Sequence, residues 1–353
     1  MCNYCEAQES LEKEFPINGN EIKIAEEIQR KSKGKKYDCV LGLSGGRDST
    51  YLVHVARKLG LRPLLVHFND GFSNPMAGQN ISNIVRKTNF ELRTITSDWR
   101  ESKDIKISCM KASVPDMEIG MDLGIASALY SIAAKENINY ILGGVSFRTE
   151  GIVPLDWNYL DGKYLKSIMK EFGTVKMKKW KANEPSFNFD IKEFLYYSFI
   201  KNIKYIPLLY HLDYKRPEAE KIIVKEFDWK YPGAHYFDDL FQSLNSYILR
   251  NKFKIDYRRF NYSSLIRSGQ YSREEALEKV QNVYEVEDPK VIQLCIDRLG
   301  LKRDDIERYL KEKPKLFLNY KSNYGLVKLA KYPIKFLCRL GLLPPSLYLK
   351  FFT

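Results

Sequence analysis

The sequence predicts an α/β fold in which crossover helices flank a parallel sheet, followed by a mainly helical C-terminal domain. Over Tyr37–Ser146, short apolar runs alternate with stretches of helical periodicity, a pattern typical of βαβ units. From about residue 236 onward, charged and aromatic helical segments replace these runs. We therefore expect an N-terminal segment (1–19), a sheet domain (20–235) and a helical domain (236–353).

Four short segments are predicted as strands, the first of them buried, and polar residues or glycines lie at or just past their ends. They are Tyr37–Leu43, Arg62–Asp70, Glu91–Asp98 and Asn139–Ser146. Helical periodicity predicts helices before and between them at Asn20–Lys33, Thr50–Leu59, Asn80–Asn89 and Met121–Asn137. Because ligands of open parallel sheets bind beyond the carboxyl ends of the strands, the residues that follow each run form the candidate site.

Further helices are expected in the C-terminal part. Ser272 followed by Glu275 is a capping box, which predicts a helix start, and Glu287–Gly300 and Lys302–Lys313 show helical periodicity. The final stretch, Gly325–Phe352, is basic and apolar and is interrupted by prolines. Two interpretations stay open for it: a packed terminal helix with a solvated basic side, or a helix that contacts a membrane surface.

Composition limits the class of protein. The chain has 353 residues, of which 44% are hydrophobic, enough for a substantial core. Its formal net charge of +13 suits nucleotides, sugar nucleotides, RNA or a membrane surface as partners. It has no apolar run of about 18 residues, and its polar, acidic start does not resemble a signal peptide. The six cysteines are scattered, so we expect a cytoplasmic protein without a disulfide framework.

The most specific motif is the stretch SGGRDS at Ser44–Ser49, directly after the first predicted strand. A glycine pair lets the backbone turn tightly and approach a ligand closely. The next helix, expected to begin near Ser49, directs its N–H groups toward the loop, and two serines add hydroxyl donors. The loop therefore predicts an anion site, although it lacks the lysine of a P-loop and the third glycine of a dinucleotide fingerprint.

This string resembles the pyrophosphate loop of the ATP pyrophosphatases (PP-loop enzymes), which cleave ATP between its α and β phosphates. The resemblance implies that the loop binds the pyrophosphate of ATP. The matching residues are Ser44, Gly45, Gly46, Arg47, Asp48 and Ser49. Asp48 is either a Mg²⁺ ligand or a favourable charge in the first helical turn. We expect four residues at other strand ends to lie near the same nucleotide: His67, Asn69, Gly143 and Gly144.

Three further stretches resemble one family, the N-acetyl sugar amidotransferases of bacterial surface-polysaccharide synthesis, including lipopolysaccharide (LPS) O-antigen. They are Lys111–Asp122, Gly143–Pro154 and Tyr231–Val280, and the resemblance extends from Cys2 to about Val280. These enzymes turn an acetamido group on a sugar into an acetamidino group and release AMP and pyrophosphate. The substrate implied here is an N-acetylated nucleotide sugar or nonulosonic acid, and the fold implied for 20–235 is an ATP pyrophosphatase domain.

The resemblance also implies roles for charged residues near the strand ends. The candidate catalytic residues are Asp48, Lys111, Asp116, Asp122 and Glu150, and the candidate substrate-binding residues are Arg148, Thr149, Glu150 and Tyr236. Lys111 would neutralise the α-phosphate, and the carboxylates would contact substrate hydroxyls, capture ammonium or remove a proton. Arg148 would meet a diphosphate or a carboxylate on the sugar. For each charged residue, the alternative is a solvated surface position or a salt bridge.

Ammonia and zinc raise separate expectations. The resemblance implies a separate glutaminase and an ammonia-delivering synthase subunit, like the pair used in histidine biosynthesis. The stretch before the loop, about 40 residues, is too short for a fused glutaminase domain.

Family members commonly carry two Cys-x-x-Cys pairs for zinc, whereas this chain has only Cys2 and Cys5. A structural zinc needs four ligands, so the others would come from elsewhere in the chain or from a dimer partner.

Two other functions are compatible with some of these observations. A tRNA thiolase would employ the same ATP loop, and the positive charge and Cys109 favour it. Cys109 has no partner cysteine nearby in the sequence, so we do not expect nucleic acid to be the substrate. A membrane-associated scaffold without activity would not require the intact loop.

Overall fold

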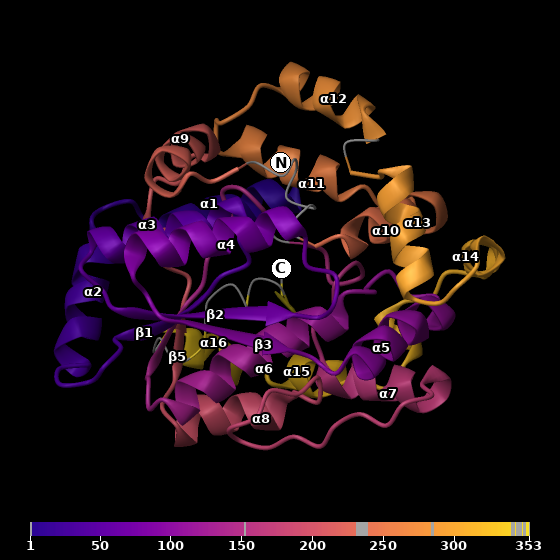
Figure 1. Ribbon diagram of the computed structural model, residues 1–353, viewed down its shortest axis with the longest axis horizontal. Helices are drawn as coiled ribbons and strands as arrows, with labels where there is room; N and C mark the ends of the chain where they lie inside the picture. The colour runs from indigo at the N-terminus through magenta and orange to yellow at the C-terminus, as the bar shows by residue number, and fades with distance from the viewer. Residues whose placement is uncertain are drawn as a thin grey trace.

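The computed structural model describes residues 2–151, 153–230, 239–283 and 286–339, together with 343, 348, 351 and 352. One sheet of five parallel strands runs through it in the order β3-β2-β1-β4-β5 (Figure 1). The strands are β1 (Cys39–Gly42), β2 (Pro63–Asn69), β3 (Leu92–Thr96), β4 (Tyr140–Leu142) and β5 (Lys204–Ile206). Strand order reverses at β1, so the crevice expected for a ligand lies beyond its carboxyl end. The predicted α/β class is confirmed.

Helices cover both faces of the sheet, with α3 and α4 on one side and α5, α6 and α7 on the other (Figure 1). The first layer consists of α2 (Asn20–Lys31), α3 (Arg47–Lys58), α4 (Pro75–Thr88) and α9 (Arg216–Phe227). The second consists of α5 (Trp99–Ala112), α6 (Ile119–Lys135), α7 (Gly162–Phe172), α8 (Ile191–Leu195) and the π-helical turn η1 (Tyr196–Ile200). The N-terminal helix α1 (Asn3–Glu14) packs against the segment that follows β4.

The two faces of the sheet bury alternate residues. Leu41 and Leu65 belong to the hydrophobic cluster of α2, α3, α4 and α9. Val40, Leu64 and Val66 belong to the larger cluster on the opposite face. This two-residue period follows from the strand pleat, and burial on both faces explains why these strands are continuously apolar.

The C-terminal part is helical and packs onto the second layer. Its elements are α10 (Phe241–Ile248), η4 (Leu249–Phe253), α11 (Tyr257–Arg267), α12 (Arg273–Gln281), α13 (Pro289–Arg298), α14 (Arg303–Lys311), η6 (Phe317–Asn319), α15 (Tyr324–Leu329) and α16 (Lys331–Arg339). The short turn η2 (Leu208–His211) lies earlier, between β5 and α9. Phe241, Ile292 and Phe317 share one hydrophobic cluster with Val40 of β1. The predicted boundary between residues 235 and 236 lies outside the described residues and stays a prediction.

Several elements differ from the sequence prediction. Helix α3 begins at Arg47, so the second half of the predicted loop is its first turn. Strand β5 and helices α1, α5, α7 and α9 were not predicted. The three residues of β5 are too few to show a period, and α5 buries polar as well as apolar side chains, which hides its inner face. The capping box of α12 is confirmed by reciprocal hydrogen bonds between Ser272 and Glu275.

Among the helices of the described residues, none has the length and apolar character needed to cross a membrane.

Candidate active site at the carboxyl edge of the sheet

The loop between β1 and α3 has a backbone that only glycine allows. Gly45 has a φ of +85°, and a Cβ there would lie 2.3 Å from the carbonyl oxygen of Ala77. Two side chains hold the loop from outside, because Asn80 Nδ2 and Trp229 Nε1 both donate to the Gly45 carbonyl, at 3.1 and 3.0 Å. The loop is therefore a preformed, tightly supported turn.

The loop directs hydrogen-bond donors toward the open edge of the sheet. The N-cap of α3 is Gly46, which has no side chain to satisfy the first N–H groups of the helix. The hydroxyls of Ser44 and Ser49 lie 3.0 Å apart at the same end of the helix, and Ser44 is exposed. A helix N-terminus with adjacent hydroxyls favours a phosphate-like anion.

Asp48 and Arg47 lie in the first turn of α3 with buried side chains. Asp48 accepts hydrogen bonds from the Tyr214 hydroxyl and from Arg47 Nε. Arg47 Nη1 also donates to Glu220 of α9 at 2.8 Å. The side chain of Arg47 thus connects α3 to α9. Its backbone lies in the anion-facing turn, and its predicted contact with the nucleotide stays a prediction.

The segment after β4 packs directly against this turn. A Cβ on Gly144 would lie 3.3 Å from Ser49 Cα, and a Cβ on Gly143 would overlap the Tyr205 hydroxyl. The segment places Glu150 beside Asp48. Burial, and then the charge of Asp48, raise the pKa of Glu150 well above its usual value. Two carboxyl groups that hold a proton between them are a feature of functional sites.

The end of β2 contributes one side chain at the loop and one that shapes the next turn. His67 Nδ1 lies 3.0 Å from the Leu43 carbonyl, and burial lowers the pKa of its imidazole, which favours the neutral ring. Asn69 Oδ1 instead accepts from the Gly71 N–H and the Ser73 hydroxyl, at 2.8 and 3.2 Å. Asn69 therefore stabilises the turn after β2.

A second group of predicted residues surrounds Tyr257 of α11. Asp116 Oδ2 accepts the Tyr159 N–H at 3.0 Å, and Asp122 Oδ2 accepts from Asn158 Nδ2 at 3.3 Å. Burial raises the pKa of the Tyr257 hydroxyl, and the charges of Asp116 and Asp122 add to the effect. The structure thus brings Asp116 and Asp122 together with a helix of the C-terminal part. Lys111 is half-buried in the last turn of α5.

Arg148 has structural partners, and its predicted role in binding the sugar stays a prediction. The side chain is only 3% exposed. Its guanidinium donates to Glu12 of α1 and to the carbonyls of Phe15 and Tyr210, the latter at 2.8 Å. Thr149 is also fully buried, and its carbonyl accepts from Arg216 at 2.9 Å. The Arg148 side chain and the Thr149 backbone carbonyl hold the segment after β4 in place.

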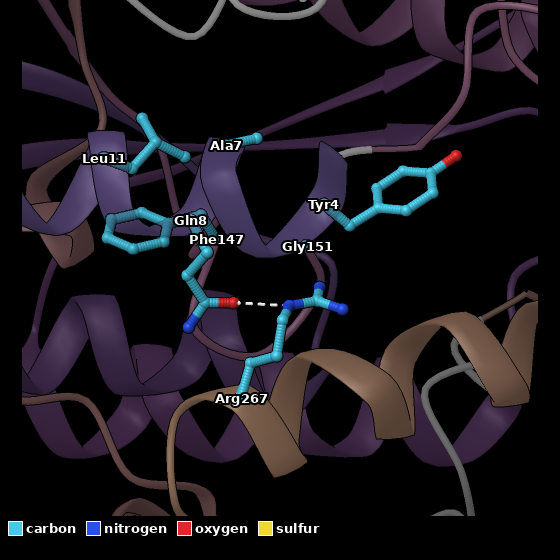
Figure 2. Close-up of a pocket in the computed structure, with 7 residues that line it drawn as sticks. All are labelled: Tyr4, Ala7, Gln8, Leu11, Phe147, Gly151 and Arg267. Carbon is cyan, nitrogen blue, oxygen red and sulfur yellow. Dashed lines mark hydrogen bonds between the residues drawn. The ribbon is translucent and has the colours of Figure 1, made fainter. Parts of the chain in front are cut away.

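Figure 2 shows how α1 covers this segment. Tyr4, Gln8 and Leu11 of α1 lie over Phe147 and Gly151, and Gln8 Oε1 accepts from Nε of Arg267 in α11 at 2.8 Å. The cavity left between them has room for about one water molecule. This contact is therefore a packing interface that fixes the segment leading to Glu150, with no space for a nucleotide.

The remaining predicted site residues are Tyr236 and the two N-terminal cysteines. Tyr236 lies outside the described residues. Cys2, the N-cap of α1, and Cys5 in its first turn lie together, with their sulfurs 3.5 Å apart. Over the described ranges, no group of three or more His, Cys, Asp or Glu side chains is placed to hold a metal ion, so the structure gives no support to a zinc site there.

A buried ion cluster was missed by sequence reasoning. Lys106 of α5, 3% exposed, lies 2.9 Å from an Asp70 oxygen and 2.7 Å from a Glu118 oxygen. Its ammonium lies 4.2 Å from the centre of the Phe241 ring. Burial and the charge of Asp70 raise the pKa of nearby Asp239 to about 7. In sequence these residues are isolated charges, so only the fold reveals the cluster.

Comparison with known protein families finds a match in the C-terminal part of the chain. Residues 223–332 match the family model described as "LPS biosynthesis protein WbpG-like, C-terminal domain". The C-terminal part of the chain is similar to WbpG-like LPS biosynthesis proteins. The matched residues include α10 to α15 and so contain Asp239 and Tyr257. The match supports the resemblance to surface-polysaccharide enzymes found in the sequence.

One similar solved structure is the NMN synthetase from Francisella tularensis. The two proteins share 14% sequence identity with a TM-score of 0.38, over 76% of this chain and 92% of that chain. No curated protein matches the chain.

Proposed function

We propose that this protein is an ATP-dependent amidotransferase that converts an acetamido group of an N-acetylated sugar into an acetamidino group for LPS or a related surface glycan. The loop Ser44–Ser49 carries the proposal, because its glycine-dependent turn, paired hydroxyls and helix N-terminus suit the pyrophosphate of ATP. The family match over residues 223–332 supports the biosynthetic setting, and the sequence resemblance supplies the reaction.

The proposed chemistry activates a poor electrophile. The amide oxygen of the sugar attacks the α-phosphorus of ATP, and the bond to pyrophosphate breaks. Ammonia then adds to the activated carbon, and AMP leaves, giving the amidine. Donors fixed at the loop stabilise the negative charge that develops on the departing pyrophosphate, and they need no reorganisation when the reaction occurs.

Within this proposal the two carboxyl clusters have different roles. Asp48 and Glu150 lie together at the loop, where burial and then the charge of Asp48 raise the pKa of Glu150, so Glu150 would carry a proton beside the phosphates. Asp116 and Asp122 are anchored by Tyr159 and Asn158, so they present fixed acceptors for sugar hydroxyls or for ammonium. We assign neutralisation of the α-phosphate to Lys111, which is half-buried at the end of α5.

Mg²⁺ fits the chemistry of the loop. Carboxylate oxygens are its usual protein ligands. In their ionised forms the adjacent carboxyls of Asp48 and Glu150 would provide them, whereas without a cation burial and then the charge of Asp48 raise the pKa of Glu150. A bound Mg²⁺ would offset the charge of the phosphates. Ammonia would come from a separate glutaminase through a synthase subunit, as the sequence resemblance implies.

Mass spectrometry of the products tests the proposal. The protein would be incubated with ATP, Mg²⁺ and ammonium, together with a panel of N-acetylated nucleotide sugars and nonulosonic acids. We expect AMP and a sugar whose carbonyl oxygen has been exchanged for NH. Failure to form AMP with every sugar, but AMP formation with tRNA and a sulfur donor, would replace the amidotransferase with a thiolase.

A paired substitution connects that activity to the loop. Ser44→Ala removes an exposed hydroxyl at the anion site, so AMP formation should fall about tenfold to a hundredfold with the fold intact. Ser82→Ala, at an exposed serine of α4, is the matched control and should have full activity. Equal rates for the two variants would remove the loop from the mechanism.

The thiolase alternative loses its principal support in the structure. Cys109 is fully buried, and burial raises the pKa of its thiol. A thiolate nucleophile requires the opposite environment, with a lowered pKa and access to the substrate. We therefore retain the thiolase only as an outcome of the product analysis.

A further inference from the structure

The outer face of α15 and α16 exposes an unusual number of large apolar side chains. Leu326, Leu329, Tyr332 and Phe336 are 62%, 83%, 79% and 61% exposed. Their spacing of three or four residues places them on one side of a helix. The helical hydrogen bonding continues between the two helices, because the Ile334 N–H donates to the Ala330 carbonyl at 2.9 Å. We call these four residues the apolar strip.

The same helices turn different residues inward. Cys338 is buried, and Val327 and Ile334 are half-buried on the side opposite the apolar strip. Burial of this inner side already attaches α15 and α16 to the protein. The apolar strip therefore contributes nothing to the described core, although a soluble surface rarely leaves such a run in water.

Positive charge accompanies the apolar strip. From Lys313 to Thr353 the sequence has no aspartate or glutamate, whereas it contains Lys313, Lys315, Lys321, Lys328, Lys331, Lys335, Arg339 and Lys350. Lys328 and Lys335 are exposed along one flank of the strip. An apolar side bordered by lysines is the pattern of a helix that lies in the interface of an anionic bilayer.

A second exposed apolar group adjoins the first. Ile191, Leu195, Phe199 and Ile200 of α8 and η1 are 38%, 41%, 45% and 73% exposed. The N-termini of α8 and α15 meet where Asn323 Nδ2 donates to Asp190 Oδ1 at 2.7 Å. Figure 1 shows α8, α15 and α16 on the same side of the sheet, away from α3 and α4.

We propose that this face docks on the surface of an anionic phospholipid membrane, with the apolar strip inserted among the lipid headgroups and the lysines contacting lipid phosphates. We favour a lipid surface over a second copy of the chain as the partner of this face, because two such basic faces would repel each other.

Vesicle co-sedimentation with the full-length protein tests the proposal. We expect binding to vesicles of phosphatidylglycerol and phosphatidylcholine, weak binding to phosphatidylcholine alone, and release at high salt. Leu326→Ser with Leu329→Ser, and separately Lys328→Gln with Lys335→Gln, should each weaken binding roughly tenfold or more.

Matched controls use exposed residues of other helices. Leu277→Ser with Leu294→Ser on α12 and α13, and Lys279→Gln with Lys290→Gln, should bind vesicles as the parent does. The proposal is overturned if the parent does not bind anionic vesicles, or if the control pairs lose as much binding as the test pairs. It is also overturned if the leucine pair changes the oligomeric state measured without lipid, since a second copy would then cover the face.

Discussion

At the scale of single residues, the lack of a side chain at Gly45 allows the loop to form. A Cβ at this position would meet the backbone of Ala77, which cannot move as a flexible side chain can, and the positive φ adds strain. Gly45→Ala should therefore lower AMP formation by about a hundredfold or more. Gly78→Ala, on the neighbouring helix α4, has nothing within 4 Å of the added carbon. Full activity of the Gly45 variant would show that the turn is not required.

Asp239 should make stability depend on pH. In the unfolded chain this carboxyl ionises near its ordinary pKa of about 4, whereas burial and Asp70 raise the folded pKa to about 7. The folded state therefore binds more protons over this window, and the free energy of unfolding falls as pH rises, by up to about 1.4 kcal/mol per pH unit.

Asp239→Asn tests this dependence, because asparagine can still accept the Phe241 N–H with its Oδ1. Urea unfolding should show a shallower loss of stability between about pH 4 and pH 7 in the variant. Asp156→Asn, at an exposed carboxylate, should leave the profile unchanged. An Asp239 variant with the parental slope would place the titration elsewhere.

At the scale of elements, Arg148 attaches α1 to the segment that carries Glu150. Its planar group reaches Glu12 and two backbone carbonyls at once, a geometry that lysine cannot reproduce. Arg148→Lys should destabilise the fold by about 1–3 kcal/mol and increase hydrogen exchange in α1. A variant with unchanged exchange but a raised KM for the sugar would favour the substrate-binding role predicted from sequence.

The elements also show what sequence could and could not predict. Strands β1, β2 and β4 were predictable because burial on both faces requires largely apolar runs, and the loop was predictable because its glycines and serines have few structural substitutes. Tyr214 and Glu220, which complete the surroundings of Asp48 and Arg47, lie far along the chain. Only tertiary packing brings them there, as it does Arg148 to Glu12.

At the scale of the whole molecule, one buried cation connects the two predicted domains. Lys106 of α5 contacts Asp70, which follows β2, and Glu118, which precedes α6. Asp239, which precedes α10, interacts electrostatically with the same ammonium group. The C-terminal helices also share the hydrophobic cluster of the sheet. We therefore expect the described parts to unfold together, with far-UV circular dichroism and tryptophan fluorescence reporting one transition.

Lys106→Met is the sharpest test of this connection. The change leaves three buried carboxyls without their cation, so the free energy of unfolding should fall by about 3–5 kcal/mol at neutral pH. The loss should be smaller at about pH 5, because Glu118 and Asp239, whose pKa values burial raises, then bind protons in place of the missing charge. Lys103→Met, at a partly exposed position of the same helix, should cost far less at both pH values. If Lys106→Met were as stable as Lys103→Met, the cluster would not join the C-terminal helices to the sheet, and an independent helical domain beginning near residue 236 would become the better description.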